Sequence, residues 1–212
     1  NPRNELASEL YSSDGKILGK YFRQNRTPVS YNDLAPELVH ALTATEDIRF
    51  EEHSGIDLIG TLAVVGSIIQ MDPRGASTIT QQVARNFFLS NEYSYFRKFK
   101  EMLLALKMEQ ELSKDEILAL YLNKIFFGNR SYGIVAAADY YYGKTLDELT
   151  LAETATLAGI PKFPSTGNPL SNSKRSMQRR DYILERMQTL GFITREAMLE
   201  AQAQPNTARP HA

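Results

Sequence analysis

The sequence predicts a mostly α-helical fold with one short β-hairpin near the N-terminus. Beyond about residue 35, apolar side chains recur at helical spacing, and clusters of Gly, Pro, Asn or Ser separate most of these segments. Only residues 7–12 and 16–22 carry many β-forming side chains, on either side of the turn signal Ser13-Asp14-Gly15. The 212 residues, 42% of them hydrophobic, suffice for the core of one domain.

Helices are expected in most of the remaining chain. The most apolar stretch, Ile56 to Met71, is shorter than the roughly 18 to 20 residues that span a bilayer and is interrupted by Asp57 and Gln70, so it should form a core helix. The expected helices lie at about 36–47, 56–70, 78–89, 95–112, 114–124, 133–142, 151–160, 173–190 and 194–203.

The composition excludes several classes of function. Lysine and arginine (24) nearly balance aspartate and glutamate (25), so the overall charge gives no general attraction to nucleic acid. Without cysteine, the chain can form neither disulfides nor zinc-thiolate sites.

The chain opens with Asn1-Pro2-Arg3-Asn4 and shows no signal peptide, so both ends are interpreted as cuts in a longer protein.

A first motif, Glu46-Asp47-Ile48-Arg49-Phe50-Glu51-Glu52-His53-Ser54-Gly55, follows an amphipathic helix. An acid at the C-terminal end of a helix has its proton affinity raised by the helix dipole, and desolvation beside Phe50 would raise it further. Glu46 is therefore the candidate general base. The alternative is a pair of ordinary surface acids.

His53 could suggest a metal cluster with Glu46 and Asp47. The spacing matches no established metal signature, and the only other histidines are His40 and His211. We therefore predict no metal site formed by the protein alone, and a hydrogen-bonded His53 that shapes the loop.

A second motif, Gly75-Ala76-Ser77-Thr78-Ile79-Thr80-Gln81-Gln82, marks a helix start, with Gln81 three residues after Thr78 as in a capping box. Unpaired backbone N–H groups at such a start can bind an anion. Arg85 and Asn86 extend polar groups along the same helix. The alternative is a well-capped helix without a ligand.

A third motif, Arg97-Lys98-Phe99-Lys100-Glu101, lies on a helix whose apolar stripe is Phe99, Met102, Leu103 and Leu106. Arg97, Lys98 and Glu101 should face away from this stripe, and Arg97 could pair with Glu101 four residues on. These charges form either a solvated face or a cleft that holds pyrophosphate.

Two further clusters have competing interpretations. Residues 87–96 are rich in aromatics and precede basic residues, which suits a membrane interface as well as a core. A later basic cluster is interpreted as the solvated face of a helix: Lys174, Arg175, Arg179 and Arg180.

Five motifs in this order resemble the family 51 peptidoglycan glycosyltransferases, and look closest to the glycosyltransferase domain of class A penicillin-binding proteins of the 1a type. The resemblance runs from about Leu10 to Gly191. Its motifs are the three above, followed by Ile117-Leu118-x-x-Tyr121-Leu122-Asn123 and Leu157-Ala158-Gly159-Ile160-Pro161-Lys162. Arg85 stands where many relatives carry lysine.

The resemblance implies a lysozyme-like large lobe with a smaller, membrane-associated jaw at about residues 87–100. The whole of 1–212 would be one glycosyltransferase domain, from a protein with an N-terminal membrane anchor and a C-terminal transpeptidase. It would act on the outer, periplasmic face of the bacterial cytoplasmic membrane. Its partners would be lipid II, the growing glycan strand, the membrane surface and other cell-wall synthesis proteins.

The implied reaction polymerises lipid II with inversion and releases undecaprenyl pyrophosphate. Glu46 would take the proton from the acceptor 4-hydroxyl, and Glu101 would position the donor pyrophosphate or its divalent cation, Mg²⁺ or Mn²⁺. Asp47, Phe50 and His53 would shape the loop of the base. The donor would be bound by Ser77, Thr78, Gln81, Arg85, Asn86, Arg97, Lys98 and Lys162.

Two other functions stay open on the sequence. A lysozyme-like glycan hydrolase or lytic transglycosylase also centres on a glutamate in a helical fold. A non-catalytic module that binds membrane or cell wall would leave the polar motifs without a role.

Overall fold

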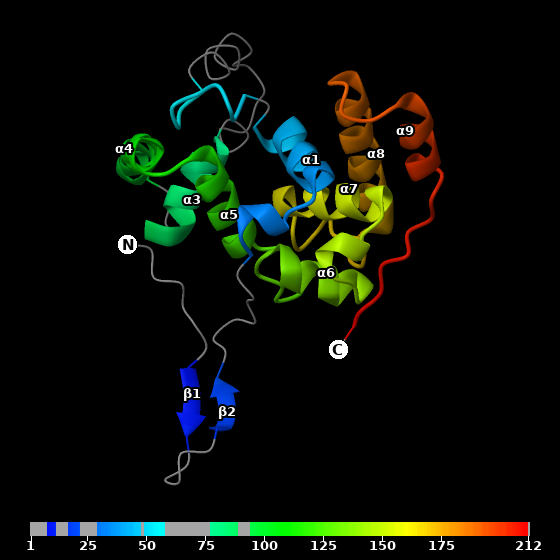
Figure 1. Ribbon diagram of the computed structural model, residues 1–212, viewed down its shortest axis with the longest axis horizontal. Helices are drawn as coiled ribbons and strands as arrows, with labels where there is room; N and C mark the ends of the chain where they lie inside the picture. The colour runs from blue at the N-terminus through cyan, green and yellow to red at the C-terminus, as the bar shows by residue number, and fades with distance from the viewer. Residues whose placement is uncertain are drawn as a thin grey trace.

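The computed structural model describes residues 8–11, 17–21, 29–47, 49–57, 77–88 and 94–211. These residues are mostly helical, which confirms the predicted fold class (Figure 1). The predicted helix at 56–70 lies largely outside the described residues. The α-helices are α1 (Pro36–Glu46), α3 (Ile79–Phe88), α4 (Tyr95–Glu111), α5 (Lys114–Lys124), α6 (Ile134–Tyr142), α7 (Leu151–Gly159), α8 (Ser173–Thr189) and α9 (Arg195–Gln202), and the 3-10 helices are η1 (Tyr31–Asp33), η3 (Leu146–Glu148) and η4 (Ile160–Lys162).

Two strands precede the helices. β1 (Ser8–Tyr11) and β2 (Ile17–Tyr21) pair antiparallel, with Ser8 opposite Tyr21 and a shift in register between Leu10 and Tyr11. The turn predicted at Ser13-Asp14-Gly15 lies outside the described residues, so the complete hairpin stays a prediction.

Several helices begin where the sequence supplies a reciprocal cap. Ser113 and Glu116 form such a capping box at the start of α5, and Thr150 and Glu153 form one at the start of α7. At the other end of α6, Gly143 takes a left-handed conformation with φ of 61°, which glycine adopts without steric strain. Local sequence therefore defines these helix ends.

The helices pack in two groups. α1 packs against α7 and α8, and α8 also contacts α9, while α3 packs against α4 and α5 (Figure 1). The largest fully buried side chains belong to Tyr121, Tyr141, Phe50 and Phe127. This arrangement brings the C-terminal end of α1 close to the N-terminal end of α3. The backbone N–H of Ile79, at the start of α3, donates a hydrogen bond to the side chain of Asp47, which follows α1.

The orientation of α4 reverses the sequence prediction. Phe99 and Leu103, expected in the buried stripe, are 57% and 51% exposed, whereas Arg97 and Glu101 are buried. Glu101 has an internal partner in Lys98, so the charged face can turn inward without leaving its carboxylate uncompensated. The apolar side chains of Phe99 and Leu103 consequently lie on the outside, while Ala105 and Met108 of the same helix are buried.

The predicted solvated face of α8 is only partly correct. Lys174 and Arg175 are exposed, but Arg180 is 3% exposed and the Arg179 side chain is 18% exposed. Arg180 is buried because its guanidinium donates to the carbonyl oxygens of Gln202 and Gln204, at 3.0 and 2.8 Å. No local pattern in the sequence indicates these distant acceptors.

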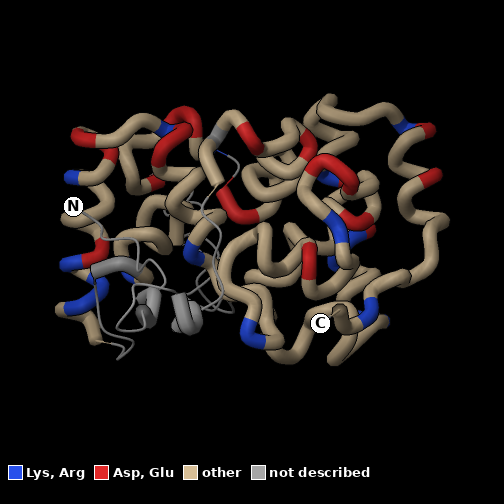
Figure 2. The backbone as a smooth tube through the Cα atoms, turned by 60° about the horizontal axis from the view of Figure 1, so that its bottom comes forward, with Lys and Arg blue, Asp and Glu red and all other residues tan. Residues whose placement is uncertain are grey.

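Charges of both signs are interspersed over the described chain (Figure 2). Within that part of the chain, none of the helices has the length and apolar character that a membrane crossing requires.

Candidate functional site

Glu46 is the last residue of α1, and its carboxyl group lies inside the protein. The side chain is 13% exposed, and Oε1 has no hydrogen-bond partner among the described residues. The nearest charged atom to this oxygen that the structure shows is Nη2 of Arg179 on α8, at 3.8 Å. A buried carboxylate oxygen without a partner is unusual in a folded protein, and such groups cluster at functional sites.

Burial raises the pKa of Glu46 above its ordinary value. The positive charges of Arg179 and Lys162 and a hydrogen bond from Gln82 act in the opposite direction, and the charge of Asp47 adds to the increase. Desolvation therefore outweighs two cations. A carboxyl group with a raised pKa is a stronger base in its ionised form, which suits proton abstraction near neutral pH.

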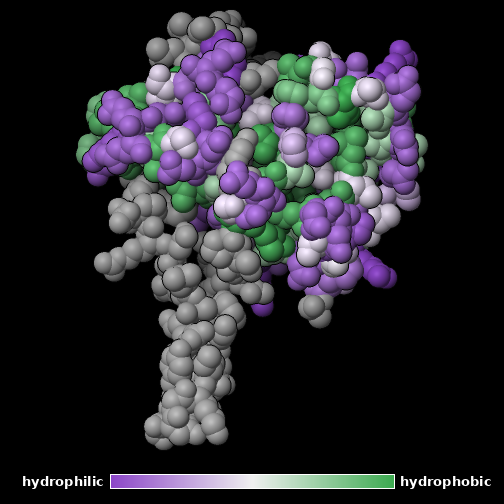
Figure 3. Space-filling model, in the orientation of Figure 1, coloured by the Kyte–Doolittle hydropathy of each residue, from purple (hydrophilic) through white to green (hydrophobic). Residues whose placement is uncertain are grey.

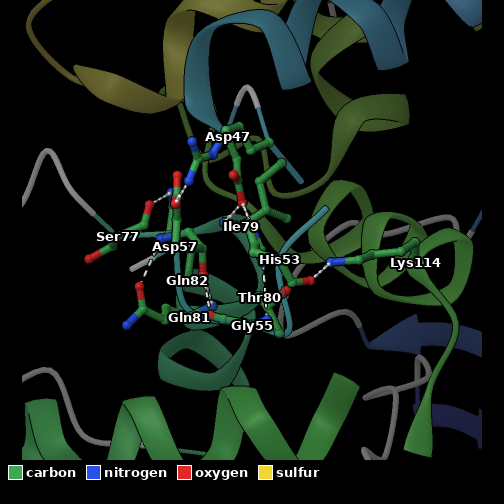
Figure 4. Close-up of polar contacts among 12 residues, drawn as sticks. Asp47, His53, Gly55, Asp57, Ser77, Ile79, Thr80, Gln81, Gln82 and Lys114 are labelled. Carbon is green, nitrogen blue, oxygen red and sulfur yellow. Dashed lines mark hydrogen bonds and ion pairs between the residues drawn. The ribbon is translucent and has the colours of Figure 1, made fainter. Parts of the chain in front are cut away.

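Asp47 connects the loop after α1 to the start of α3 (Figure 4). Its Oδ2 accepts a hydrogen bond from the backbone N–H of Ile79 at 3.0 Å and lies 2.7 Å from Nε2 of His53. Since Nδ1 of His53 accepts from the N–H of Gly55 at 3.0 Å, Nε2 carries the proton and donates to Asp47. His53 is thus hydrogen-bonded within the loop, as the sequence predicts.

The side chain of Asp47 therefore binds the start of α3, where the sequence analysis considered an anion from a ligand. Asp47 caps the positive end of α3. The Thr78 hydroxyl donates to the carbonyl of Gly55 at 2.7 Å and accepts from the N–H of Gln81 at 3.1 Å. Gln81 completes the predicted capping box by accepting from the N–H of Thr78 at 2.9 Å. Both side chains belong to buried residues, so these contacts explain the two residues structurally.

Further hydrogen bonds connect the loop after α1 with α3, α4 and α5. Nζ of Lys114 donates to the carbonyl oxygen of His53 at 2.6 Å and to Oε1 of Glu109 at 2.8 Å, and the Thr80 hydroxyl donates to the same oxygen at 2.8 Å. Lys114 also lies 4.6 Å above the ring of Phe50, which is 1% exposed. Sequence reasoning missed Glu109 and Lys114, because no local pattern connects α4 and α5 with this loop.

A cationic group lies on the side of α4. Nζ of Lys98 is 2.7 Å from Oε1 of Glu101 and donates to Oγ of Ser77 at 2.6 Å. Glu101 is fully buried, and its Oε2 has no hydrogen-bond partner within the described part of the chain. Arg97 is buried beside this pair in sequence. The second and third motifs therefore meet in space through Ser77 and Lys98.

The remaining predicted residues surround Glu46 less closely. Lys162 is exposed at the end of η4 but near enough to lower the pKa of Glu46. Arg85 is half-buried on α3, and its charge acts on the Tyr121 phenol. Asn86 is exposed. Gln82, Tyr121 and Arg179 also act on or respond to Glu46, although the sequence analysis gave none of them a role at the site and expected Arg179 on a solvated face.

A comparison with protein families decides the assignment. The family model described as transglycosylase matches residues 14–188, most of the chain. The chain belongs to the transglycosylase family. As a transglycosylase domain, it is an enzyme that transfers glycosyl groups, which confirms the class of activity expected from the five motifs.

Penicillin-binding proteins 1A are among the curated proteins that are similar to this chain. Penicillin-binding protein 1A of Escherichia coli is 48% identical over 212 residues, covering 99% of this chain and 25% of that protein. Penicillin-binding protein 1A of Pseudomonas aeruginosa is 46% identical over 100% of this chain and 26% of that protein. The chain thus spans about a quarter of the length of these relatives.

The fold is also similar to a solved structure. The crystal structure of penicillin-binding protein 1A from Haemophilus influenzae gives a TM-score of 0.56 at 32% identity, over 98% of this chain and 22% of that one.

Within the described part of the transglycosylase domain, no group of three or more His, Cys, Asp or Glu side chains could hold a metal ion. Glu101 Oε2 is a single available oxygen, whereas Mg²⁺ requires about six ligands. The side chains fit a cation only if a bound diphosphate and water supply most of its ligands.

Cavity size does not locate the site. A cavity of about 760 Å³ lies between α7, α8, α9 and the C-terminal segment, and another of about 640 Å³ lies beside η3 and α6. Glu46 lines neither. Glu46 is therefore the candidate base because of its buried carboxyl group and its charged neighbours, not because it lines a large pocket.

Proposed function

We propose that this domain polymerises lipid II into β-1,4 glycan strands with inversion at the anomeric carbon, releasing undecaprenyl pyrophosphate. The observation that supports this most directly is the buried Oε1 of Glu46, which has no hydrogen-bond partner in the described chain. The family assignment supports glycosyl transfer, and a free carboxylate oxygen supports a general base for it.

In the proposed reaction, Glu46 accepts the proton of the acceptor 4-hydroxyl as that oxygen attacks the donor anomeric carbon. The new carbon–oxygen bond forms on the face opposite the bond to the diphosphate. That bond breaks, and the diphosphate leaves with its electron pair. Attack and departure on opposite faces invert the configuration. The product diphosphate keeps the negative charge, which nearby cations must stabilise.

The pair Lys98–Glu101 is suited to receive that charge. In the absence of substrate, the buried carboxylate of Glu101 neutralises Lys98 at 2.7 Å, and Ser77 fixes the ammonium group. A diphosphate would add charge-assisted hydrogen bonds from Lys98. We further propose that Arg85, Asn86, Arg97 and Lys162 contact the donor, and that Ser77, Thr78 and Gln81 shape this side of the site.

A divalent cation, Mg²⁺ or Mn²⁺, is proposed to arrive with the diphosphate. Glu101 Oε2 would supply one ligand, consistent with its lack of a hydrogen-bond partner in the described residues. The chemistry that such a cation supplies is neutralisation of the leaving diphosphate.

The exposed apolar side of α4 is proposed to contact the membrane that carries the lipid substrate. Tyr95, Phe96, Phe99 and Leu103 are 88%, 67%, 57% and 51% exposed. Figure 3 shows hydrophobic surface at the edge of the molecule over α4. These residues overlap the proposed jaw at 87–100. We further propose that the domain acts at the outer face of the cytoplasmic membrane, as part of a membrane-anchored protein and alongside other cell-wall synthesis proteins.

The decisive experiment replaces Glu46 by glutamine and measures polymerisation of lipid II. Loss of a positioned general base should lower the rate at least about 10²-fold, because such a base contributes typically about 10²–10⁴-fold. The matched control is Glu37→Gln, which changes an exposed glutamate in the first turn of the same helix and should leave the rate unchanged.

Incubation with finished peptidoglycan separates transfer from hydrolysis. Polymer from lipid II and no fragments from peptidoglycan would support the proposal. Fragments from peptidoglycan without polymer would identify a glycan hydrolase or lytic transglycosylase instead. A Glu46→Gln variant within a few-fold of the wild-type rate would remove Glu46 as the base.

A further inference from the structure

We propose that Arg179 is a positioning residue for the base: its guanidinium orients the Glu46 carboxylate and favours its ionised state without occupying Oε1. This inference rests on the proposed function, in which Glu46 must be ionised before it can accept a proton.

The geometry shows two largely buried groups, a guanidinium and a carboxyl group, that face each other without a hydrogen bond. Nη2 of Arg179 lies 3.8 Å from Oε1 of Glu46, beyond the roughly 3.2 Å limit of a good hydrogen bond. The two side chains are 18% and 13% exposed. Oε1 of Glu46 and Nε of Arg179 both lack hydrogen-bond partners among the described residues.

This distance distinguishes Arg179 from a structural salt bridge. A buried ion pair offsets its desolvation only with close, well-satisfied hydrogen bonds, which this pair does not have. A closer, bidentate arginine would occupy the carboxylate oxygens and weaken the base. At 3.8 Å the positive charge still acts on the carboxylate while Oε1 stays open to an incoming hydroxyl.

Gly159 at the end of α7 provides the space for the arginine. A Cβ at this position would lie 2.8 Å from Cγ of Arg179 and 3.3 Å from Cδ1 of Ile183. The backbone of Gly159 has ordinary helical angles, φ of −81° and ψ of −16°, so its conformation does not demand glycine. The absence of a side chain therefore lets the Arg179 stem pass α7 toward α1.

The groups that act on Glu46 come from α8, η4, α3, α5 and the loop after α1. Among the described cations that act on it, Arg179 has the largest effect and Lys162 the next. Lys162 is exposed to solvent, so its charge is better screened. Asp47 adds a negative charge, Gln82 contributes a neutral amide, and burial raises the pKa of the Tyr121 phenol, which therefore stays uncharged.

Removing the Arg179 charge should therefore shift the ionisation of Glu46 to higher pH. An opposite charge at 4 to 6 Å typically lowers a carboxyl pKa by about 1 unit or more, so its loss should move the acidic limb of the pH–rate profile up by about one pH unit. Below that limb the variant should be about tenfold slower than wild type, and at high pH the two rates should converge.

The test compares Arg179→Met, Arg179→Lys and the control Arg186→Met, which makes the same change on the same helix. Two measurements are made on each 212-residue protein. One is the pH–rate profile of lipid II polymerisation. The other is an NMR titration of ¹³C-labelled glutamate side chains, with the Glu46 signal assigned by its loss in Glu46→Gln. The titration needs no activity.

The expected result is an upward shift in both measurements for Arg179→Met, restoration by Arg179→Lys, and no change for Arg186→Met. Gly159→Ala, which displaces the arginine without removing it, should give a smaller shift in the same direction. An unchanged Glu46 titration in a folded Arg179→Met protein would overturn the inference, as would an equal loss of rate at every pH. If the wild type makes no polymer, the proposed function fails, whereas the titration still decides the role of Arg179.

Discussion

At the scale of single residues, ionised Glu46 lowers the free energy of unfolding of the domain. A carboxyl group whose pKa is raised by burial binds its proton more tightly in the folded than in the unfolded protein. Its contribution to stability is fully present below the pKa of the unfolded chain and is lost as the pH rises through the higher pKa of the folded protein. The proposed base is therefore most unfavourable to folding in the pH range where it can act.

Glu46→Gln should consequently stabilise the domain while it lowers the rate of polymerisation. At pH 8 the variant should unfold with a free energy higher than wild type by on the order of 1 kcal/mol, as when a strained active-site residue is neutralised. The gain should shrink toward pH 4, where Glu46 is mostly protonated even in the unfolded chain. Urea unfolding of both proteins at the two pH values measures this, and a variant less stable than wild type at pH 8 would contradict the explanation.

Residue-level prediction from sequence was most successful where the chemistry is local. The helix end at Glu46 and the cap formed by Thr78 and Gln81 both follow from residue types at short spacing. The partners that tune Glu46 are 36 and 133 positions away in Gln82 and Arg179 (82 − 46 and 179 − 46), so no local pattern could indicate them.

At the scale of an element, α4 is the helix whose orientation the sequence did not predict. Helical periodicity identifies an apolar side and a charged side but not which one faces the core. Here the charged side turns toward α3, where Lys98 meets Ser77, and the apolar side is left exposed. A large exposed apolar surface on one helix is typical of a site that contacts a membrane or a partner.

The double variant Phe96→Gln, Phe99→Gln should weaken binding to lipid vesicles. Burial of one phenylalanine contributes about 1.5–3 kcal/mol, so even partial insertion of two rings should make the loss about tenfold or more. Flotation with vesicles of phosphatidylethanolamine and phosphatidylglycerol measures it. Leu199→Gln, which changes a side chain 49% exposed on α9, serves as the control. Equal flotation of all three proteins would leave the apolar side of α4 without this role.

At the scale of the whole molecule, Arg180 connects α8 by hydrogen bonds to the C-terminal segment, residues 202–211. Its guanidinium holds the carbonyls of Gln202 and Gln204, and the segment beyond them donates backbone hydrogen bonds from Arg209 and His211 to the end of α6. α8 thus serves two functions from adjacent residues, because Arg179 points to the base and Arg180 to the tail.

Arg180→Met should loosen that segment and destabilise the domain by about 2–3 kcal/mol, the size expected for the loss of hydrogen bonds from a charged group. Hydrogen exchange should increase in residues 203–211 before the rest of the protein, because the tail loses its attachment first. Arg186→Met on the same helix should leave both measurements near wild type. Uniform exchange rates in Arg180→Met would argue against the fastening role.

The sequence by itself determined the helical fold class, most helix boundaries, the family and the identity of the proposed base, because periodicity, caps and motif residues are all encoded at short range. Only the tertiary structure decided that Asp47 caps α3, that α4 turns its charged side inward and that Arg179 faces Glu46. These features depend on contacts between segments far apart in the chain, and they are set by which partners can compensate a buried charge.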